Sequence, residues 1–378
     1  MSGLIILIVV LFFLCYAVLL FYYRSGWLQL EEITTDKHHD PKTKVTIIIP
    51  ARNEEEHIGH VLKDILSQYY PTHLMEVIVV DDHSEDRTAE IVSEYKGVKL
   101  IHLAQIIGTE KLNAYKKKAI EAAIKESSGD LIVTTDADCR FKPYWLLSIV
   151  SFYEKHKVQF IAAPVSMTYK NLGFEYFQAL DFTTMQGITG ALSFFQNGAM
   201  CNGANLAYTR NAFVAVNGFK DIDSIASGDD MLLMYKIEKK FPKQTRYLKN
   251  KEAIAETPAL DSFHAFLQQR IRWASKANHF ADKRIQWVLY LVYFFNALFP
   301  LLLLLGLFWN ALFATFWVLL LSKTYIEGLF LFPVCDFFSK PKNWLRFFLF
   351  QFLHIPYILI SGFLGQSGSY QWKNRQVK

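Results

Sequence analysis

The sequence lacks the cysteine spacing of a disulfide framework or of a zinc site. Its four cysteines, Cys15, Cys139, Cys201 and Cys335, are scattered along the chain, and two of them lie in or beside apolar runs. Zinc sites and small secreted folds bring cysteines together in short, repeated spacings. A reducing compartment is therefore the simpler interpretation.

Two glycine-rich nucleotide motifs are also missing. The chain has no G-x-G-x-x-G dinucleotide fingerprint and no phosphate-binding loop ending in Gly-Lys-Ser/Thr. A nucleotide bound here would therefore not be held by a glycine loop. Its diphosphate would need a metal ion instead.

The charged middle part of the chain, residues 24–284, has no excess of positive charge. The formal charge of +5 comes entirely from residues 285–378, which carry seven Lys or Arg and two Asp or Glu. Residues 24–284 are balanced, with 33 charged residues of each sign. A nucleic-acid-binding protein places its bases in a patch on the folded domain, so we expect no nucleic acid partner. A composition of 52% hydrophobic and 20% charged residues also excludes a disordered chain.

What the chain does have is long apolar runs, the first of them at the N-terminus. Residues 4–23 include no charged residue, and a helix of that length is about 30 Å long, which matches the hydrocarbon core of a bilayer. A cleaved signal peptide is the alternative, but it needs a basic start, and residues 1–3 are uncharged. Tyr22, Tyr23 and Arg24 are typical of an interfacial edge with a positive flank. We therefore expect 1–24 to be a retained anchor whose C-terminal end is cytoplasmic.

Two further apolar runs lie near the C-terminus. Residues 286–322 are uncharged over 37 positions, enough for most of two spans with a break near Pro300 or Trp309. Lys323 and Glu327 follow at a spacing that places them on one helix face, where they would pair inside the membrane. The alternative is that the helix ends near Ser322 and both lie in water. With the run 347–372, we expect about three membrane segments in 285–372.

Basic residues on both sides of the last run leave its orientation open. Bases at 340–346 and at 373–378 each predict a cytoplasmic position, and both cannot hold if the run crosses completely. Either the run 347–372 is re-entrant or interfacial, or the basic tail at 373–378 violates the positive-inside rule. We expect a multi-pass protein of the cell (inner) membrane with a cytoplasmic catalytic domain.

Between the apolar segments, short apolar runs alternate with helical patterns. Strands are predicted at 45–50, 77–80, 99–103 and 131–135, and helices at 53–69, 86–95, 111–127 and from Pro143 onward. Asn53 is predicted to cap the first helix, with three glutamates in its first turn. The alternation predicts an α/β fold over 44–260, Rossmann-like, with a mostly parallel sheet and helices on both faces.

Acidic and amide residues follow three of these strands. They occur in 50–54, at Asp81 and Asp82, and at Asp136 and Asp138. In parallel sheets ligands bind outside the carboxyl ends of the strands, so these residues are predicted to share one crevice. Two carboxylates plus substrate phosphates suit Mg²⁺ or Mn²⁺. The alternative is that the acids only cap turns and helices.

A further acidic pair, Asp229 and Asp230, precedes a predicted helix at 231–240. One explanation of this acidic pair is that its negative charge is stabilised by the N-terminus of the following helix. The other is that Asp230 is a general base that accepts a hydroxyl proton.

A basic and aromatic segment lies on a helix predicted at about 262–280. Gln269 and Trp273 share one helix face, with Arg272 beside them. Arg binds diphosphates in a bidentate manner, and Trp stacks on sugars. The alternative, compatible with this one, is an amphipathic interfacial helix over 261–284.

This ordered set of motifs resembles membrane-bound glycosyltransferase family 2, with the GT-A fold and a Gln-x-x-Arg-Trp motif, over roughly residues 44–283. The resemblance implies an inverting hexosyltransferase that uses a nucleotide-diphosphate sugar, with a UDP-sugar expected, and Mg²⁺ or Mn²⁺. One departure is that the acidic pair is Asp-Asp, where many relatives have Glu-Asp. The resemblance implies donor binding by Pro50, Arg52, Glu54, Asp81, Asp82, Lys117, Asp136, Gln269, Arg272 and Trp273, metal binding by Asp138 and Asp136, catalysis by Asp230 beside Asp229, and acceptor binding by Asn202, Gly203 and Trp273.

Three other functions are weighed against this one. A membrane-associated sugar nucleotidyltransferase also has an acidic nucleotide crevice, but it needs neither Gln-x-x-Arg-Trp nor membrane helices. A transporter or scaffold would need more spans. A processive polysaccharide synthase shares the motif, but the few spans favour a lipid-linked acceptor.

Overall fold

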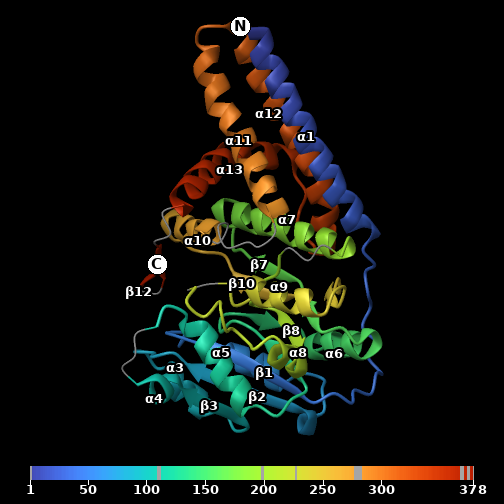
Figure 1. Ribbon diagram of the computed structural model, residues 1–378, viewed down its shortest axis with the longest axis vertical. Coiled ribbons are helices and arrows are strands. Elements are labelled where there is room, and N and C mark those ends of the chain that lie inside the picture. Colours follow the sequence, from blue (N-terminus) through green and yellow to red (C-terminus); the bar gives the residue numbers. More distant parts are fainter. Residues whose placement is uncertain are drawn as a thin grey trace. The chain divides into compact units, whose positions relative to one another are not determined.

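The computed structural model describes residues 2–108, 112–196, 200–225, 228–275, 283–366, 370–372 and 375–377 (Figure 1). The chain divides into two units. The globular unit consists of Gln29–Lys170 and Ile188–Ala259, and the helical unit consists of Met1–Leu28, Asn171–Gly187 and Leu260–Lys378.

A seven-stranded sheet forms the centre of the globular unit. Its strands are β1 (Val45–Ala51), β2 (Met75–Asp81), β3 (Val98–His102), β4 (Leu131–Thr134), β6 (Phe160–Ala162), β8 (Leu206–Thr209) and β9 (Thr245–Tyr247). The strand order is β3-β2-β1-β4-β8-β6-β9, and only β8 runs antiparallel to its neighbours. The predicted α/β fold with a mostly parallel sheet is therefore confirmed.

Both faces of this sheet are covered. Consecutive side chains of a strand point to opposite faces, and Ile47, Ile48 and Ile49 of β1 are all fully buried. In the globular unit the helices and the 3₁₀ turn η1 are α2 (Ile58–Leu66), η1 (Thr72–Leu74), α3 (Thr88–Ser93), α4 (Leu103–Ile107), α5 (Tyr115–Glu126), α6 (Trp145–His156), α8 (Arg210–Ala215) and α9 (Met231–Lys240). Of these, α5 packs against β1 and β2.

A smaller sheet follows the acidic turn after β4. It has the order β5-β10-β7, with strands β5 (Arg140–Phe141), β7 (Val165–Thr168) and β10 (Ala255–Pro258). Thr257 of β10 donates from its hydroxyl to Asp138 Oδ2 at 3.3 Å. This sheet therefore supports one of the predicted metal ligands.

The first predicted helix starts later than expected. Asn53 does not cap it, because Asn53 has a φ of 50° and α2 begins only at Ile58, so the three glutamates precede the helix. The amide of Glu54 donates instead to Thr88 Oγ1 at 2.8 Å. That partner is the first residue of α3, so the segment in front of α2 is held by a contact with the next helix along the chain.

Other helix boundaries differ by a few residues. Helix α5 begins at Tyr115, and Lys111, where we predicted its start, lies outside the described residues. Helix α6 begins at Trp145, two residues after the predicted start at Pro143. The predicted helix at 231–240 is confirmed as α9.

Long helices dominate the helical unit. They are α1 (Ser2–Gln29), α7 (Phe174–Phe194, which continues into the globular unit), α10 (Phe263–Ser275), α11 (Lys283–Gly306), α12 (Asn310–Phe337) and α13 (Trp344–Gly365), followed by the strands β11 (Tyr370–Trp372) and β12 (Arg375–Val377). Residues 276–280 of the predicted helix 262–280 lie outside the described residues.

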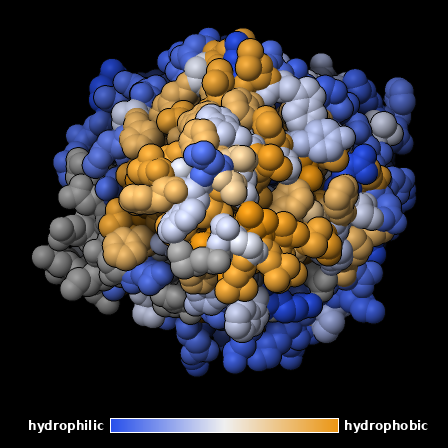
Figure 2. Space-filling model, turned by 90° about the horizontal axis from the view of Figure 1, so that it is seen from above, coloured by the Kyte–Doolittle hydropathy of each residue, from blue (hydrophilic) through white to orange (hydrophobic). Residues whose placement is uncertain are grey.

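Four of these helices, α1, α11, α12 and α13, are long and apolar enough to cross a membrane. The break in the long apolar run lies at residues 307–309, as predicted near Trp309, whereas Pro300 is inside α11. Figure 2 shows a face of the molecule on which apolar side chains gather. Large exposed apolar residues include Leu7, Leu11, Leu304, Phe308 and Val318.

Lys323 and Glu327 pair inside the helical unit. Helix α12 continues beyond Ser322 to Phe337, so the alternative of a helix end near Ser322 is wrong. Lys323 Nζ lies 2.7 Å from Glu327 Oε1, and Lys323 is completely buried. Tyr16 of α1 donates to the same carboxylate at 2.5 Å, so the pair links α12 to the N-terminal helix.

Candidate active site

Three neighbouring parallel strands end at one edge of the large sheet. Pro50 near the end of β1 is in register with Val80 of β2, and Ile48 of β1 is in register with Thr134 of β4. The segments that follow, Arg52–Glu54, Asp81–Asp82 and Asp136–Asp138, therefore leave the sheet along the same edge. The sheet topology brings the predicted donor-binding segments of the globular unit to one side.

The loops after β1 and β2 are tied together by Arg52. Its Nη1 donates to the carbonyl oxygens of Asp82 at 2.9 Å and His83 at 3.2 Å. Arg52 and Asp82 are both buried. Arg52 thus supports the backbone that carries Asp82, in addition to any contact with a donor.

The two acids after β2 have different surroundings. Asp82 Oδ1 lies 2.9 Å from His83 Nδ1. Asp81 Oδ1 accepts from the amide of Ser84 at 3.2 Å, and its other oxygen lies 3.5 Å from His102 Nδ1. Asp81 therefore fulfils the turn-capping role weighed as the alternative, while Asp82 lies on the loop that Arg52 holds.

The centre of the acidic group is Lys116, at the start of α5. Its Nζ lies 2.7 Å from Asp136 Oδ1 and 3.2 Å from Asp229 Oδ2. Burial acts to lower the pKa of Lys116, but the carboxylates of Asp136, Asp229 and Asp230 outweigh it and raise the pKa, so the ammonium form is favoured. Asp136 after β4 and Asp229 before α9 thus both pair with the ammonium group of Lys116.

The family resemblance implies donor binding by the neighbouring Lys117 instead. Lys117 is buried and donates to the carbonyl oxygens of Ile222 at 2.6 Å and Ile225 at 2.7 Å. It therefore supports the loop that leads toward Asp229, and its role toward the donor stays a prediction. Lys116 was given no separate role, because a run of three lysines does not reveal which one faces the acids.

Gly203 brings the predicted acceptor segment to the same acids. A Cβ atom at Gly203 would lie 3.1 Å from both Asp229 Oδ2 and Lys116 Nζ. The Gly203 amide donates to Asp230 Oδ2 at 3.3 Å, while Asn202 Oδ1 accepts from the amide of Ala204 at 2.9 Å. The turn at 202–205 leads into β8 and presents a backbone N–H to Asp230.

Asp230 also caps helix α9. Its Oδ1 accepts from the amide of Met231 at 2.7 Å, as the helix N-terminal explanation predicts. Capping uses one oxygen and Gly203 contacts the other, so the side chain is held in one orientation beside Asp229. A carboxylate fixed in this way is suited to accept a proton from a bound hydroxyl group.

The described residues provide few ligands for a metal ion. Across these parts of the chain, no group of three or more His, Cys, Asp and Glu side chains is arranged to hold one. Asp136 is paired with Lys116, and Asp138 accepts from Thr257. Two carboxylates fit a Mg²⁺ or Mn²⁺ ion that takes its remaining ligands from substrate phosphates and water.

Tyr208 of β8 was not singled out from the sequence. Its hydroxyl group is buried and has no hydrogen-bond partner among the described residues. Burial and the negative charge of Asp229 raise its pKa, so the hydroxyl stays protonated. Only the folded structure reveals this residue, because its sequence context is that of an ordinary strand.

The residues of the Gln-x-x-Arg-Trp motif lie on α10, in the helical unit, whereas the acids lie in the globular unit. Gln269, Arg272 and Trp273 are half-buried. Their roles toward donor and acceptor stay predictions.

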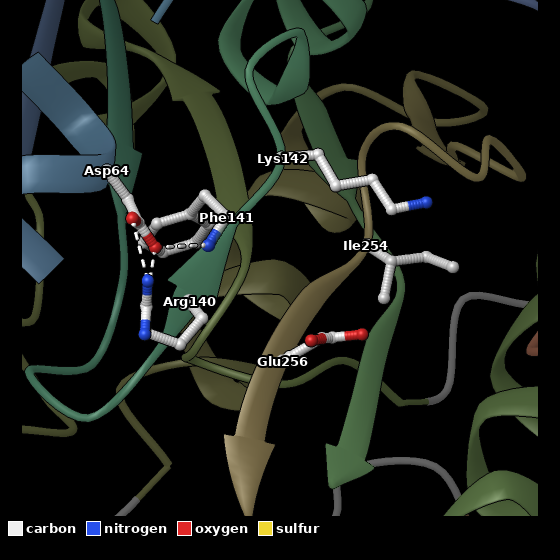
Figure 3. A pocket seen from close by; sticks show the side chains of 6 residues that line it. All are labelled: Asp64, Arg140, Phe141, Lys142, Ile254 and Glu256. Carbon is white, nitrogen blue, oxygen red and sulfur yellow. Dashed lines mark hydrogen bonds and ion pairs between the residues drawn. The ribbon is translucent and has the colours of Figure 1, made fainter. Parts of the chain in front are cut away.

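A separate hollow of about 280 Å³ is lined by residues of α2, of β5 and β10, and of the chain next to these two paired strands (Figure 3). Figure 3 shows Asp64 and Arg140 turned toward each other, and Arg140 Nε lies 2.6 Å from Asp64 Oδ2. The charge of Arg140 is thus compensated within the protein. Its six lining residues, Asp64, Arg140, Phe141, Lys142, Ile254 and Glu256, include none of the predicted site residues.

Comparison with known sequences identifies the region that carries the acids. Residues 46–216 match the model of glycosyl transferase family 2. The probable glycosyltransferase YdaM of Bacillus subtilis is 41% identical over 97 residues, 25% of this chain and 23% of that protein. Glycosyltransferase AglE of Haloferax volcanii is 31% identical over 191 residues, 50% of this chain and 59% of that protein. The chain thus spans less than two thirds of the length of either relative.

A solved structure shares the fold over nearly the whole chain. Mannosyltransferase PcManGT from Pyrobaculum calidifontis, solved with GDP-Man and Mn²⁺, aligns with a TM-score of 0.58 and 19% identity. The alignment covers 97% of this chain and 99% of that chain. At this identity the likeness concerns the fold, which is the GT-A fold with additional helices that we expected.

Proposed function

We propose, from the match of residues 46–216 to glycosyl transferase family 2, that this protein transfers a sugar from a nucleotide-diphosphate sugar to a hydroxyl group of a lipid-linked or saccharide acceptor at a membrane. The observation that carries the proposal is the convergence of Asp136 and Asp229 on Lys116, with Gly203 against Asp229 and Asp230. A donor site and a general base have to lie this close for direct transfer.

The reaction we propose is a single displacement with inversion. The acceptor oxygen attacks the anomeric carbon, the bond from that carbon to the diphosphate breaks, and Asp230 takes the acceptor proton. The contacts from Met231 and Gly203 hold the Asp230 carboxylate in place for this step. Lys116 places a positive charge next to Asp136, where the leaving diphosphate would gain negative charge.

The donor is assigned to the sheet edge. Glu54 and Asp82 would contact the nucleoside, and Asp136 and Asp138 would hold Mg²⁺ or Mn²⁺ together with the diphosphate. When bound, such an ion supplies positive charge that stabilises the leaving diphosphate. Gln269, Arg272 and Trp273 of the helical unit are assigned, by the family resemblance, to the donor diphosphate and the acceptor. A UDP-sugar is the first donor to test, and GDP-mannose, which PcManGT binds, is the second.

A membrane location is supported by the four long apolar helices. Arg24 near the end of α1, Lys283 and Arg284 at the start of α11, and 340–346 after α12 would all lie on one side if α1, α11 and α12 cross. The positive-inside rule makes that side the cytoplasm, where the globular unit would meet its donor. We propose the cell (inner) membrane.

Helix α13 contacts the pair formed by α7 and α10 along its length. Phe350 lies 5.4 Å from Phe177 of α7, measured between ring centroids, and Tyr357 lies 5.2 Å from Phe266 of α10. A Cβ atom at Gly365 would lie 2.7 Å from Ala274 Cβ. If α10 is interfacial, as the sequence predicts, α13 follows it along the interface and does not cross. This would leave the C-terminal tail cytoplasmic and resolve the conflict between the two basic segments.

The test incubates protein in detergent extract with labelled sugar nucleotides and Mn²⁺, with EDTA as the metal-free condition. We expect label to appear in a lipid or polymer, and its mass to identify sugar and acceptor. Asp230→Asn should lower kcat by about 10²–10⁴-fold while donor binding persists. The control is Asp223→Asn, an exposed acid, which should transfer normally.

Other outcomes would contradict the proposal. Pyrophosphate release from a nucleoside triphosphate and a sugar phosphate would support the nucleotidyltransferase. A product series of increasing length would support a processive synthase. Normal turnover by Asp230→Asn would remove Asp230 from the mechanism.

A further inference from the structure

Arg270 is a buried arginine inside the Gln-x-x-Arg-Trp segment to which the motif assigns no role. Only 3% of the residue is exposed. Its Nε and Nη2 donate to Asp181 Oδ2 of α7 at 2.9 and 2.6 Å. The other carboxylate oxygen, Oδ1, accepts from the hydroxyl group of Tyr357 of α13. Both oxygens of Asp181 are thus engaged, and three helices of the helical unit meet at this contact.

The rest of the guanidinium group faces the motif itself. Nη1 of Arg270 donates to Gln269 Oε1 at 2.5 Å. The guanidinium carbon lies 4.3 Å from the ring centroid of Trp273 and 4.4 Å from that of Phe266. Arg270 therefore contacts two of the three motif residues, one by a hydrogen bond and one by stacking.

These contacts use properties that only arginine has. A planar guanidinium donates at several edges while its faces stack on aromatic rings, whereas a lysine ammonium does neither in a fixed geometry. A simple buried ion pair would need only the charge. The orientation of the guanidinium is fixed by Asp181 and Tyr357, and it in turn fixes the Gln269 amide and the Trp273 ring.

We propose that Arg270 is a positioning residue, held by Asp181 and Tyr357, that sets the orientation of Gln269 and Trp273 for glycosyl transfer. The proposal rests on the proposed function, because the motif residues matter only if they hold donor and acceptor. It adds that α13 controls the geometry of the motif through one tyrosine hydroxyl group.

The first test measures kinetics of Arg270→Lys, Asp181→Asn and Tyr357→Phe. We expect Arg270→Lys to lower kcat by about 10–100-fold, since small misplacements of positioning groups have effects of that order, and Tyr357→Phe to lower it by about 3–10-fold. Binding of the nucleoside without its diphosphate, which we assign to Glu54 and Asp82 of the globular unit, should stay within about twofold. The matched control is Tyr176→Phe, which removes a buried hydroxyl group that donates to the carbonyl of Pro341 and should leave kcat unchanged.

A double variant separates positioning from loss of structure. If Asp181 acts through Arg270, the Asp181→Asn/Arg270→Lys protein should be no slower than Arg270→Lys alone. Additive losses would overturn the proposal, and so would wild-type kcat in Arg270→Lys.

A second readout does not depend on activity. The emission of Trp273 is obtained as the difference between each protein and its Trp273→Phe partner. In Arg270→Lys we expect this emission to shift to longer wavelength and acrylamide to quench it at least about twofold faster, because the ring loses its guanidinium partner. An unchanged difference spectrum would overturn the positioning role. If the wild type transfers no sugar yet the spectrum changes as expected, the proposed function fails while the contact itself stands.

Discussion

At the residue scale, Lys116 decides the electrostatics of the acidic group. It is the cation that lies between Asp136 and Asp229, and without it the carboxylates would repel each other. We expect Lys116→Gln to lower kcat/KM about 10–100-fold, chiefly through a raised donor KM, because the diphosphate also loses a charged partner. Donor titrations at saturating Mn²⁺ measure this.

The control for this change is Lys118, two residues further along α5. Lys118 pairs at 3.6 Å with Glu121 on the outside of α5, and Lys118→Gln should leave the donor KM within about twofold. Equal effects of the two changes would mean that net charge, rather than the position of Lys116, controls donor binding.

The sequence does not show which of the two adjacent lysines, Lys116 or Lys117, faces the acids. Successive residues of a helix point about 100° apart, so one of two adjacent lysines can face the acids while the other faces the loop at 222–225. Which one does so depends on the rotation of α5 about its axis. That rotation is set by its packing on β1 and β2, which no local pattern encodes. By contrast, Asp136 follows the end of a strand, and Asp229 and Asp230 precede a helix. Such positions can be predicted from the sequence.

At the element scale, β1, β2 and β4 were predicted well because they are mostly buried and therefore have apolar sequences. The start of the first helix was not, because Asn53 and the following glutamates have the composition of a helix start. Their amides bind side chains about 30 residues further along the chain, such as Asp86 Oδ2, which accepts from the amide of Glu55 at 3.0 Å. Contacts between loops of neighbouring strands override local propensity, and they occur at the sheet edge where the site lies.

The ion pair within α12 gives an element-scale prediction about stability. Lys323 Nζ also donates to Gln351 Oε1 of α13 at 2.6 Å, and Gln351 Nε2 donates to Glu327 Oε2 at 2.8 Å. Lys323→Met leaves a carboxylate that is only 12% exposed without a cation, and breaking a buried pair of this kind costs about 3–5 kcal/mol. We expect a marked fall in the melting temperature in detergent.

Removing both charges of the pair should recover most of the stability that Lys323→Met loses. Lys323→Met/Glu327→Gln keeps an amide that Tyr16 and Gln351 can still contact, and neutral replacements of buried pairs are often tolerated. Lys342→Met serves as the control, because Lys342 pairs with Asp336 at an exposed position where the effect should be below about 1 kcal/mol. A double variant less stable than Lys323→Met would contradict this account.

At the scale of the whole molecule, the number of membrane crossings depends on whether α13 crosses or follows the interface. Helix α12 is 28 residues long, about 42 Å, so it exceeds the hydrocarbon core and has room to cross completely. Helix α13 begins after Pro341, whose carbonyl oxygen accepts from Tyr176 of α7, and it ends against Ala274 of α10. The segment just before α13 thus contacts α7, and the last residue of α13 contacts α10. If α10 is interfacial, as we propose, α13 would return to the side from which it started.

Reporter fusions distinguish three crossings from four. With three crossings, green fluorescent protein fused after Lys378 should fluoresce in a bacterial host, and alkaline phosphatase fused there should be inactive. The reverse should hold for fusions after Phe308, in the segment between α11 and α12, because α11 has crossed by that point. An active phosphatase at both positions would mean that α13 crosses as well. The positive residues of the tail would then lie outside, against the charge rule that the other segments obey.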